Sequence, residues 1–117
     1  MAPQDSAFLT ELYQLMEKEL SNSELDINNI SHQLRMSRTK FYYKVKGLTS
    51  QTPAVFFRTY KLNRAAELIA GHRYTLSEIA DMTGFSTLSH FSRSFKNHFG
   101  TSPSSYDGTK TDHTNPD

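Results

Sequence analysis

The sequence contains no cysteine, and its hydrophobic residues form no run long enough to cross a membrane. Without cysteine there are no disulfides and no thiolate metal sites, which suits a reducing compartment. A membrane-spanning helix needs about 18 consecutive apolar residues, and no signal peptide is visible. We therefore expect a cytoplasmic domain without membrane contact, and 117 residues allow one small domain or two very small ones.

The usual features of an enzyme are also missing. The five histidines are scattered, and His90 and His98 lie eight residues apart with no carboxylate or cysteine nearby. No glycine-rich phosphate loop, metal-binding pair or nucleophile motif is present. We therefore expect no catalysis, no cofactor and no metal site.

Acidic residues are scarce in the middle of the chain. Residues 35–106 carry eleven bases and three acids, whereas residues 1–34 carry one base and six acids. The last eleven residues carry one base and three acids. A basic middle between acidic ends indicates a polyanion partner, although an ordinary solvated surface would give the same balance.

Hydrophobic spacing predicts an all-α fold. We expect an amphipathic helix over residues 6–21, capped by Ser6 or Asp5, a brief helix capped by Asp26, and a third helix from the turn at 35–37 to about Gly47. The longest predicted helix covers residues 52–71, with Pro53 at its first position and Gly71 at its left-handed end. About 18 residues of helix would span about 27 Å.

The second half of the chain repeats this plan. Residues 75–78 form a capping box that opens a short helix, residues 84–86 make a tight turn, and a longer helix runs from about Thr87 to Phe99. A final helical turn at Ser102–Tyr106 brings the expected total to about seven helices. We predict helix-turn-helix subdomains at 6–51 and 72–106, a linker helix at 52–71 and a disordered tail at 107–117.

Eight positions of the two halves match in order. The offset is 49 residues up to the turn and 50 after it, which predicts one residue inserted at the start of the later helix. This agreement indicates a duplicated helix-turn-helix unit. The matched pairs are Ile27/Leu76, Ile30/Ile79, Ser37/Ser86, Phe41/Phe91, Val45/Phe95, Lys46/Lys96, Pro53/Pro103 and Phe56/Tyr106.

The outward faces of the second helix of each unit, the helices that end at about Gly47 and Phe99, contain no acid. Once Phe41/Val45 and Phe91/Phe95 are placed inward, helical periodicity leaves bases, hydroxyls, phenols and an imidazole outward. Such a face can exchange hydrogen bonds with base edges and tolerate the phosphates of a major groove. The sequence therefore predicts binding of double-stranded DNA.

Three motifs resemble those of the AraC-type transcription regulators. They are I-A-x-x-x-G-F from Ile79 to Phe85, F-S-R-S-F-K from Phe91 to Lys96, and F-G-T-S-P-S-S-Y from Phe99 to Tyr106. The resemblance covers about residues 8–106. It implies two helix-turn-helix subdomains on a rigid linker, each placing a recognition helix in one of two major grooves about 34 Å apart. It also implies transcription regulation, with activation favoured.

The resemblance also assigns residue roles, position by position. Phosphate contacts would set the register, and base contacts the sequence preference. Arg93 is the strongest candidate, because its guanidinium matches guanine O6 and N7, whereas Tyr42 or Tyr43 could turn back over the core. The base-reading positions are Thr39, Tyr42, Tyr43, Ser89, His90 and Arg93, and the phosphate positions are Arg38, Lys40, Lys46 and Lys96.

Four positions depart from the family pattern. Lys61 stands for the usual linker arginine, Ser50 for a glycine after the first recognition helix, and Asp107 for an arginine after the last tyrosine. Arg35 occupies the turn position that Gly84 holds in the second half. The domain also resembles the DNA-binding end of longer regulators, including two-component hybrids, so an upstream regulatory domain and RNA polymerase are further expected partners.

A protein-interaction module is the alternative to DNA binding. It would use an exposed aromatic patch of Tyr42, Tyr43, Phe56 and Tyr60. That function predicts binding of a protein partner that depends neither on DNA nor on the salt concentration.

Overall fold

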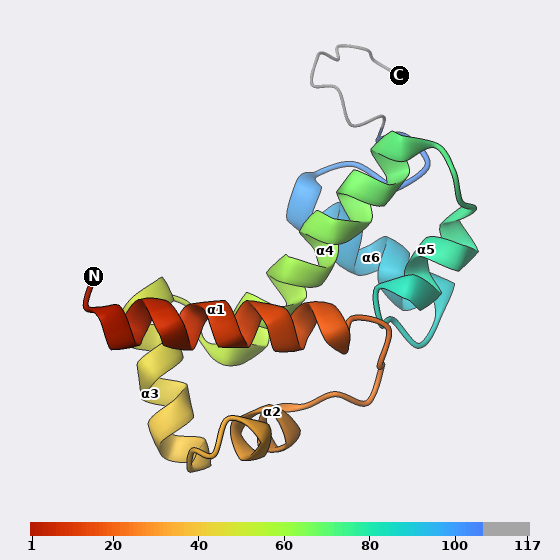
Figure 1. Cartoon of the computed structure of the whole chain (residues 1–117). Coiled ribbons are helices and arrows are strands. Elements are labelled where there is room, and N and C mark those ends of the chain that lie inside the picture. The colour runs from red at the N-terminus through yellow and green to blue at the C-terminus, as the bar shows by residue number, and fades with distance from the viewer. Residues whose placement is uncertain (107–117) are drawn as a thin grey trace. The chain divides into compact units, whose positions relative to one another are not determined.

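The computed structural model describes residues 1–106, and this part of the chain contains six α-helices and no strand (Figure 1). The all-α prediction is therefore confirmed, and the predicted tail at 107–117 lies outside the described residues. The chain divides into two compact units, Met1–Arg58 (unit 1) and the part from Thr59 onward (unit 2). The helices are α1 Pro3–Lys18, α2 Ile27–Gln33, α3 Arg38–Thr49, α4 Pro53–Gly71, α5 Leu76–Met82 and α6 Leu88–Phe99.

Helix α1 begins and ends three residues earlier than predicted. Its N-cap is Ala2, which offers no side-chain cap, and Pro3 occupies the first turn, where a missing N–H costs nothing. The prediction that Ser6 or Asp5 caps the helix is therefore wrong. The Asp5 carboxylate instead lies 3.4 Å from the Lys44 ammonium of α3.

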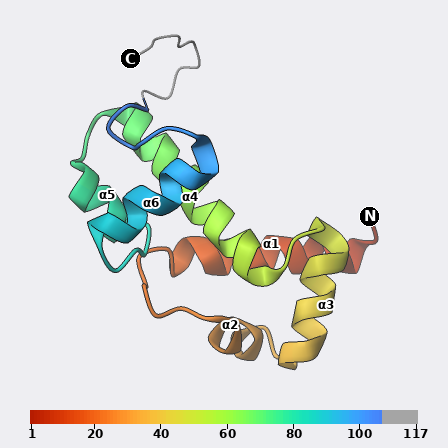
Figure 2. The same ribbon diagram turned by 180° about the vertical axis from the view of Figure 1, so that it is seen from behind.

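Unit 1 has its core where α1, α2, α3 and the start of α4 meet. Phe41 of α3 is fully buried, and its ring packs edge-on against Phe8 of α1, with ring centres 6.1 Å apart. Figure 2 shows the same helices from behind. The buried apolar side chains of this unit are Phe8, Leu12, Met16, Ile30, Leu34, Phe41, Val45 and Phe56.

Unit 2 has a core of aliphatic side chains from α4 and α5 and phenylalanines from α6. Neighbouring rings along α6 and into the following turn lie 4.5–5.7 Å apart, from Phe85 through Phe91 and Phe95 to Phe99. Tyr106 closes this row, 5.2 Å from Phe95. The core residues are Leu62, Ala65, Ala66, Ile69, Ile79, Ala80, Phe85, Phe91 and Phe95.

The two units repeat the same backbone hydrogen bonds around the helix-turn-helix turn. The Met36 N–H donates to the Ser31 carbonyl, and the Phe85 N–H donates to the Ala80 carbonyl, both at 2.9 Å. Arg35 and Gly84, the residues before these donors, both have positive φ, at 58° and 78°. The predicted match between Arg35 and Gly84 is thus seen directly in the backbone.

The extra residue of unit 2 lies in the turn and not at the start of α6. Ser37 caps α3 by accepting from the Lys40 N–H at 3.1 Å, and Thr87 caps α6 by accepting from the His90 N–H at 3.0 Å. Ser37 therefore corresponds to Thr87, and the predicted pairing of Ser37 with Ser86 is wrong. Ser86 is the inserted residue.

Helix α4 begins as predicted and ends one residue later than its left-handed end was placed. Thr52 caps it, with the Val55 N–H 3.4 Å from the Thr52 hydroxyl. Gly71 is still helical, and His72 takes the left-handed conformation with φ 55°. The capping box of α5 is confirmed in both directions, Thr75 to Glu78 and back.

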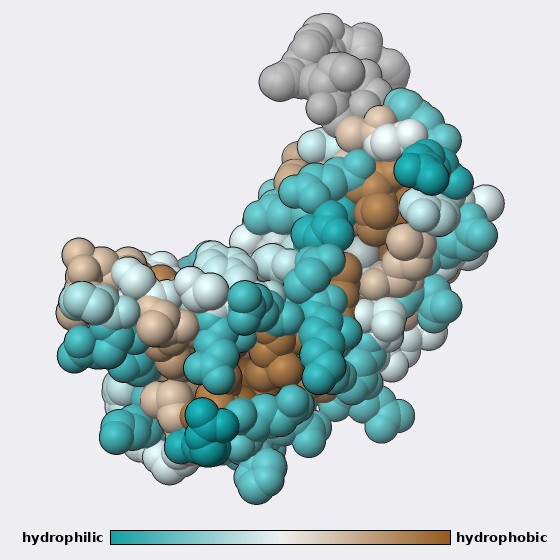
Figure 3. Space-filling view, viewed as in Figure 1, coloured by the Kyte–Doolittle hydropathy of each residue, from teal (hydrophilic) through white to brown (hydrophobic). Residues whose placement is uncertain are grey.

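The expected seventh helix is a single hydrogen-bonded turn. The Tyr106 N–H bonds to the carbonyls of Ser102 and Pro103, and no further helical turn follows within residues 1–106. None of the described helices is long and apolar enough to span a membrane. On the face in Figure 3, hydrophilic side chains cover most of the surface and apolar side chains show between them in separate patches.

Candidate nucleic-acid interface

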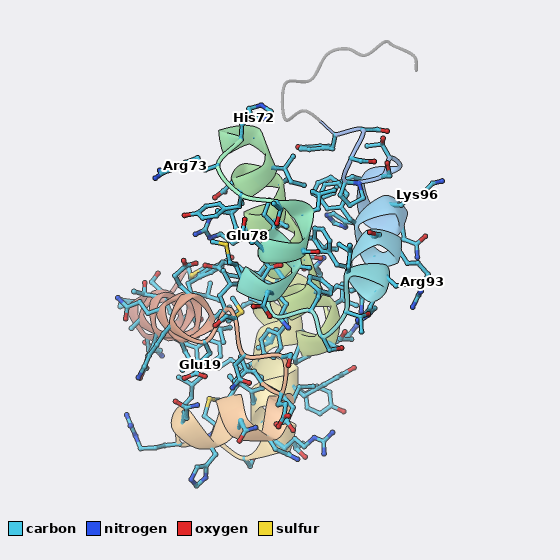
Figure 4. All side chains as sticks on the ribbon, turned by 90° about the vertical axis from the view of Figure 1, so that its right-hand side faces the viewer. Glu19, His72, Arg73, Glu78, Arg93 and Lys96 are labelled. Atoms are coloured by element: carbon cyan, nitrogen blue, oxygen red, sulfur yellow. The ribbon has the colours of Figure 1, made fainter. Side chains whose placement is uncertain are left out.

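The outward face of α6 is solvent-exposed along its length. Phe91 and Phe95 are fully buried, which leaves Ser89, His90 and Arg93 exposed on the other side. Lys96 is exposed one turn after them. Figure 4 shows Arg93 and Lys96 projecting away from α6 on the same side. These four side chains, predicted separately, therefore share one accessible surface.

Arg93 is held in position by its own helix. Its Nη1 donates to the Ser89 hydroxyl at 2.8 Å, one turn earlier on α6. This bond uses one of the five guanidinium N–H groups and leaves the others for a ligand. A guanidinium that is already oriented loses less conformational entropy when it forms a bidentate contact.

The His90 side chain is supported by the turn that precedes α6. Its ring packs edge-on against Phe85, with ring centres 5.4 Å apart, and Phe85 in turn packs against Phe91. The imidazole is thus fixed between the exposed face of α6 and the core of unit 2. Sequence periodicity placed His90 only beside the outward face and gave no sign of this support.

Lys61 was noted in the sequence only as a departure from the family pattern, and the structure gives it a role. Its ammonium lies 3.4 Å from the Gly84 carbonyl, within donating distance, and 5.8 Å from the centre of the Phe85 ring. Partial burial lowers the pKa of the Lys61 ammonium by desolvation. Lys61 therefore supports the turn that carries Phe85 and, through it, His90. The contact joins residues 23 positions apart, so the sequence gave no local signal for it.

The outward face of α3 combines aromatic and basic side chains. Tyr43 is 68% exposed and Tyr42 is half-buried, and their rings meet edge-on with centres 5.3 Å apart. Thr39 is exposed one turn before Tyr43. Of the two tyrosines, Tyr42 is therefore the less accessible, and Tyr43 projects into solvent.

The cations predicted to contact phosphate are accessible. Arg38, Lys40 and Lys46 are all exposed on α3, as is Lys96 on α6, and within residues 1–106 none of the four pairs with a carboxylate. Lys44, in contrast, is occupied by Asp5 and lies 5.2 Å from the centre of the Phe8 ring. The helix thus keeps three of its lysines and arginines available and uses the fourth to hold α1.

The aromatic patch proposed for a protein-interaction module is reduced in the structure. Phe56 is only 8% exposed and packs against Tyr13, and Tyr60 is half-buried. Tyr42 is half-buried as well, so Tyr43 is the one exposed member of the four, and it lies on α3 itself. No group of three metal-binding side chains occurs in the described part of the chain.

Comparison with known proteins agrees with this geometry. A family model described as a helix-turn-helix domain matches residues 30–108. A crystal structure from Chromobacterium violaceum, described as a transcriptional regulator of the AraC-type DNA-binding domain-containing proteins, superposes with a TM-score of 0.79 and 26% identity, covering 91% of this chain and 94% of that one. The chain belongs to the AraC-type helix-turn-helix DNA-binding domains.

Two further structures have the AraC-type fold of this chain. The C-terminal domain of AraT, a response regulator from Geobacillus stearothermophilus, has a TM-score of 0.80 at 24% identity and covers 99% of this chain and 93% of that domain. The DNA-binding domain of AdpA, described as a global transcriptional factor in complex with a target DNA, has a TM-score of 0.77 at 24% identity, covering 85% and 88%.

A longer relative contains an AraC-type segment as a small part. Histidine kinase P4 of Formosa agariphila is 31% identical over 102 residues, which are 87% of this chain and 7% of that protein. The AraC-type chain thus spans a small fraction of this relative.

The AraC-type DNA-binding family is non-catalytic, so the expectation of a DNA-binding regulator and not an enzyme is confirmed.

Proposed function

We propose that this AraC-type domain binds double-stranded DNA sequence-specifically, with α3 and α6 each in a major groove, and thereby activates transcription. The observation that carries the proposal is the repeated frame: both units present an acid-free, exposed helix face after the same hydrogen-bonded turn. A recognition helix in the major groove needs this combination of donors, acceptors and cations. The AdpA domain, which shares the fold, is described in complex with its target DNA.

The proposed contacts divide into two kinds. Arg93, held by Ser89, would donate to a guanine, and the exposed cations would contact phosphates. Base contacts are proposed for Thr39, Tyr42, Tyr43, Ser89, His90 and Arg93. Phosphate contacts are proposed for Arg38, Lys40, Lys46 and Lys96.

The proposed target is bipartite. Helix α4 is continuous from Pro53 to Gly71 and contributes to both units, so the two recognition helices belong to one covalent scaffold. We propose that they enter successive major grooves on one face of the duplex, which places the half-sites about one helical turn apart. Two covalently joined, unequal units favour a direct or asymmetric repeat over a palindrome.

The wider setting of the domain is also proposed. The kinase relative is far longer than this chain, which supports a DNA-binding module that receives its signal from an upstream regulatory domain. RNA polymerase is the expected partner of an activator, and a cytoplasmic location follows from a DNA target.

Selection from a pool of random-sequence duplexes tests the proposal. The expected winner has two half-sites about one helical turn apart, and its affinity falls steeply as salt rises, because phosphate contacts release counterions. Enrichment of a single half-site that depends only on Ser89, His90 and Arg93 would contradict the two-groove proposal. Absence of any enrichment, with binding indifferent to salt, would contradict DNA binding altogether.

A further inference from the structure

The same positions of α3 and α6 carry different chemistry. After the turn, each residue of unit 1 corresponds to the residue 50 positions later in unit 2, as the caps Ser37 and Thr87 show. Tyr42 and Tyr43 therefore correspond to Ser92 and Arg93, while Thr39 corresponds to Ser89. The matching positions 43 and 93 are both exposed, and they hold a phenol ring in one unit and a guanidinium in the other.

The tyrosine pair offers apolar surface at a place where α6 offers hydrogen-bond donors. Tyr43 exposes 68% of its surface, and the edge-on contact with Tyr42 fixes the two rings against each other. Tyrosine has only two side-chain torsions, so little conformational entropy remains to be lost on contact. The ring edges and faces carry no donor or acceptor apart from the single hydroxyl at the tip.

The surroundings of the rings favour DNA as the occupant. Arg38 lies one helical turn before Tyr42 and Lys46 one turn after it, and both are exposed. Neither pairs with a carboxylate within residues 1–106. An apolar pair framed by available cations is complementary to the major groove, where phosphates flank the bases and the thymine C5 methyl is the apolar group on the base edge.

We infer that α3 reads thymine methyl groups through the Tyr42–Tyr43 pair, whereas α6 reads guanine through Arg93. The inference rests on the proposed DNA binding and adds the class of base that each unit recognises. It gives the bipartite site a thymine-containing half for unit 1 and a guanine-containing half for unit 2.

The test replaces each thymine of the selected site, one at a time, by deoxyuridine, which removes only the C5 methyl. Binding is measured with the parent chain and with the Tyr43→Ala and Tyr43→Phe variants. At one or two thymines the parent chain should bind the uracil duplex about fourfold more weakly than the thymine duplex, the loss expected for one buried methyl-sized contact. Tyr43→Ala should abolish this difference at those positions, and Tyr43→Phe should keep it.

The variants also assign the half-sites. Leu88 exposes apolar surface on α6 as well, but any methyl contact that it makes will persist in Tyr43→Ala. Because Tyr43 is exposed, its replacement leaves the core intact, and an unchanged melting temperature of the variant checks this point.

Two outcomes separate the inference from the function on which it rests. If the domain selects a duplex site but every uracil duplex binds as well as its thymine parent, the methyl-reading inference is overturned while DNA binding stands. The same holds if the uracil effect survives unchanged in Tyr43→Ala. If no duplex is selected at all, the proposed function itself fails.

Discussion

Unit 1 and unit 2 take the same left-handed backbone conformation at the turn and at the end of the recognition helix, but with different residues. Unit 1 does so at greater conformational cost. Arg35 and Ser50 take positive φ in unit 1, where unit 2 has Gly84 and Gly100. A side chain in the left-handed region costs roughly 1–2 kcal/mol, which glycine avoids. The frame of hydrogen bonds is therefore imposed by the packing of the helices, and glycine is the easy but not the required way to satisfy it.

The units also differ in how their recognition helices are held. Helix α3 is fastened to α1 through the Lys44–Asp5 ion pair and the Phe8–Phe41 contact. Helix α6 is held by ring contacts that run from Phe85 to Phe99. At the turn it is also held by the Lys61 ammonium, which lies within donating distance of the Gly84 carbonyl. Unit 1 thus depends on an additional helix, whereas unit 2 draws its support from α4.

The largest expected effect comes from removing one buried ring from the core of each unit. Phe41→Ala and Phe91→Ala each remove a fully buried ring and should cost about 3–5 kcal/mol, most of the stability of a unit this small. Calorimetry combined with amide NMR signals should show Phe41→Ala unfolding unit 1 and Phe91→Ala unfolding unit 2. If either variant removed the signals of both units together, the units would fold as one and the comparison would break.

The next effect separates base contacts from phosphate contacts. Arg93→Ala should relax the preference at one base pair by about 1–3 kcal/mol, because a bidentate guanine contact is lost. Lys96→Ala, and its unit 1 counterpart Lys46→Ala, should weaken binding to all sequences and reduce the salt slope by about one. Titrations of matched and mismatched duplexes at several salt concentrations measure both quantities. Uniform weakening by Arg93→Ala would show that its assignment to a base is wrong.

A smaller effect tests the difference at the helix ends. Gly100→Ala should destabilise unit 2 by about 1–2 kcal/mol through backbone strain alone. An added Cβ at Gly100 would meet no atom within 4 Å, so crowding makes no contribution. Ser50→Gly is the matched change and should stabilise unit 1 by about 0.5 kcal/mol. Urea unfolding of both variants gives the signs, and a loss of stability in Ser50→Gly would contradict the strain at this position.

The smallest effect is a pH dependence of unit 2. Burial lowers the pKa of Lys61 below its ordinary 10.5, so in the folded state the amine loses its proton at a lower pH than in the unfolded state. In that window the unfolded chain binds more protons, and the stability of unit 2 therefore rises as pH increases toward 10.5. Lys61→Met should flatten this rise relative to the parent chain in unfolding curves measured from neutral pH upward. Identical pH slopes would show that desolvation of Lys61 is unimportant.

Much of the fold was readable in the sequence because the signals were local. Thr52, Thr75 and Asp26 cap helices as predicted, and apolar spacing placed Phe41 and Phe91 in their cores. The errors arose where a local signal competed with tertiary contacts. Asp5 looked like a cap but pairs with Lys44, and the serine at 86 resembled Ser37 although the cap is Thr87.

The candidate site was predicted residue by residue, but not its supports. Periodicity gave the exposed faces of both recognition helices, because buried phenylalanines fix the helix orientation. It gave neither the Ser89–Arg93 bond nor the contact of Phe85 with His90, since both depend on side-chain geometry. The role of Lys61 under Gly84 joins residues 23 positions apart and has no local signature.

The repeated turn has a consequence for how such a domain diverges. Tyr43 and Arg93 occupy matching places, yet both are exposed and neither caps a helix. Under the proposed DNA binding, a substitution at either place would change the base that the helix contacts and would leave the buried core unchanged. Under the same proposal, the two copies of a duplicated unit could each acquire a different half-site by single substitutions, so the recognised sequence could lengthen while the fold stayed the same.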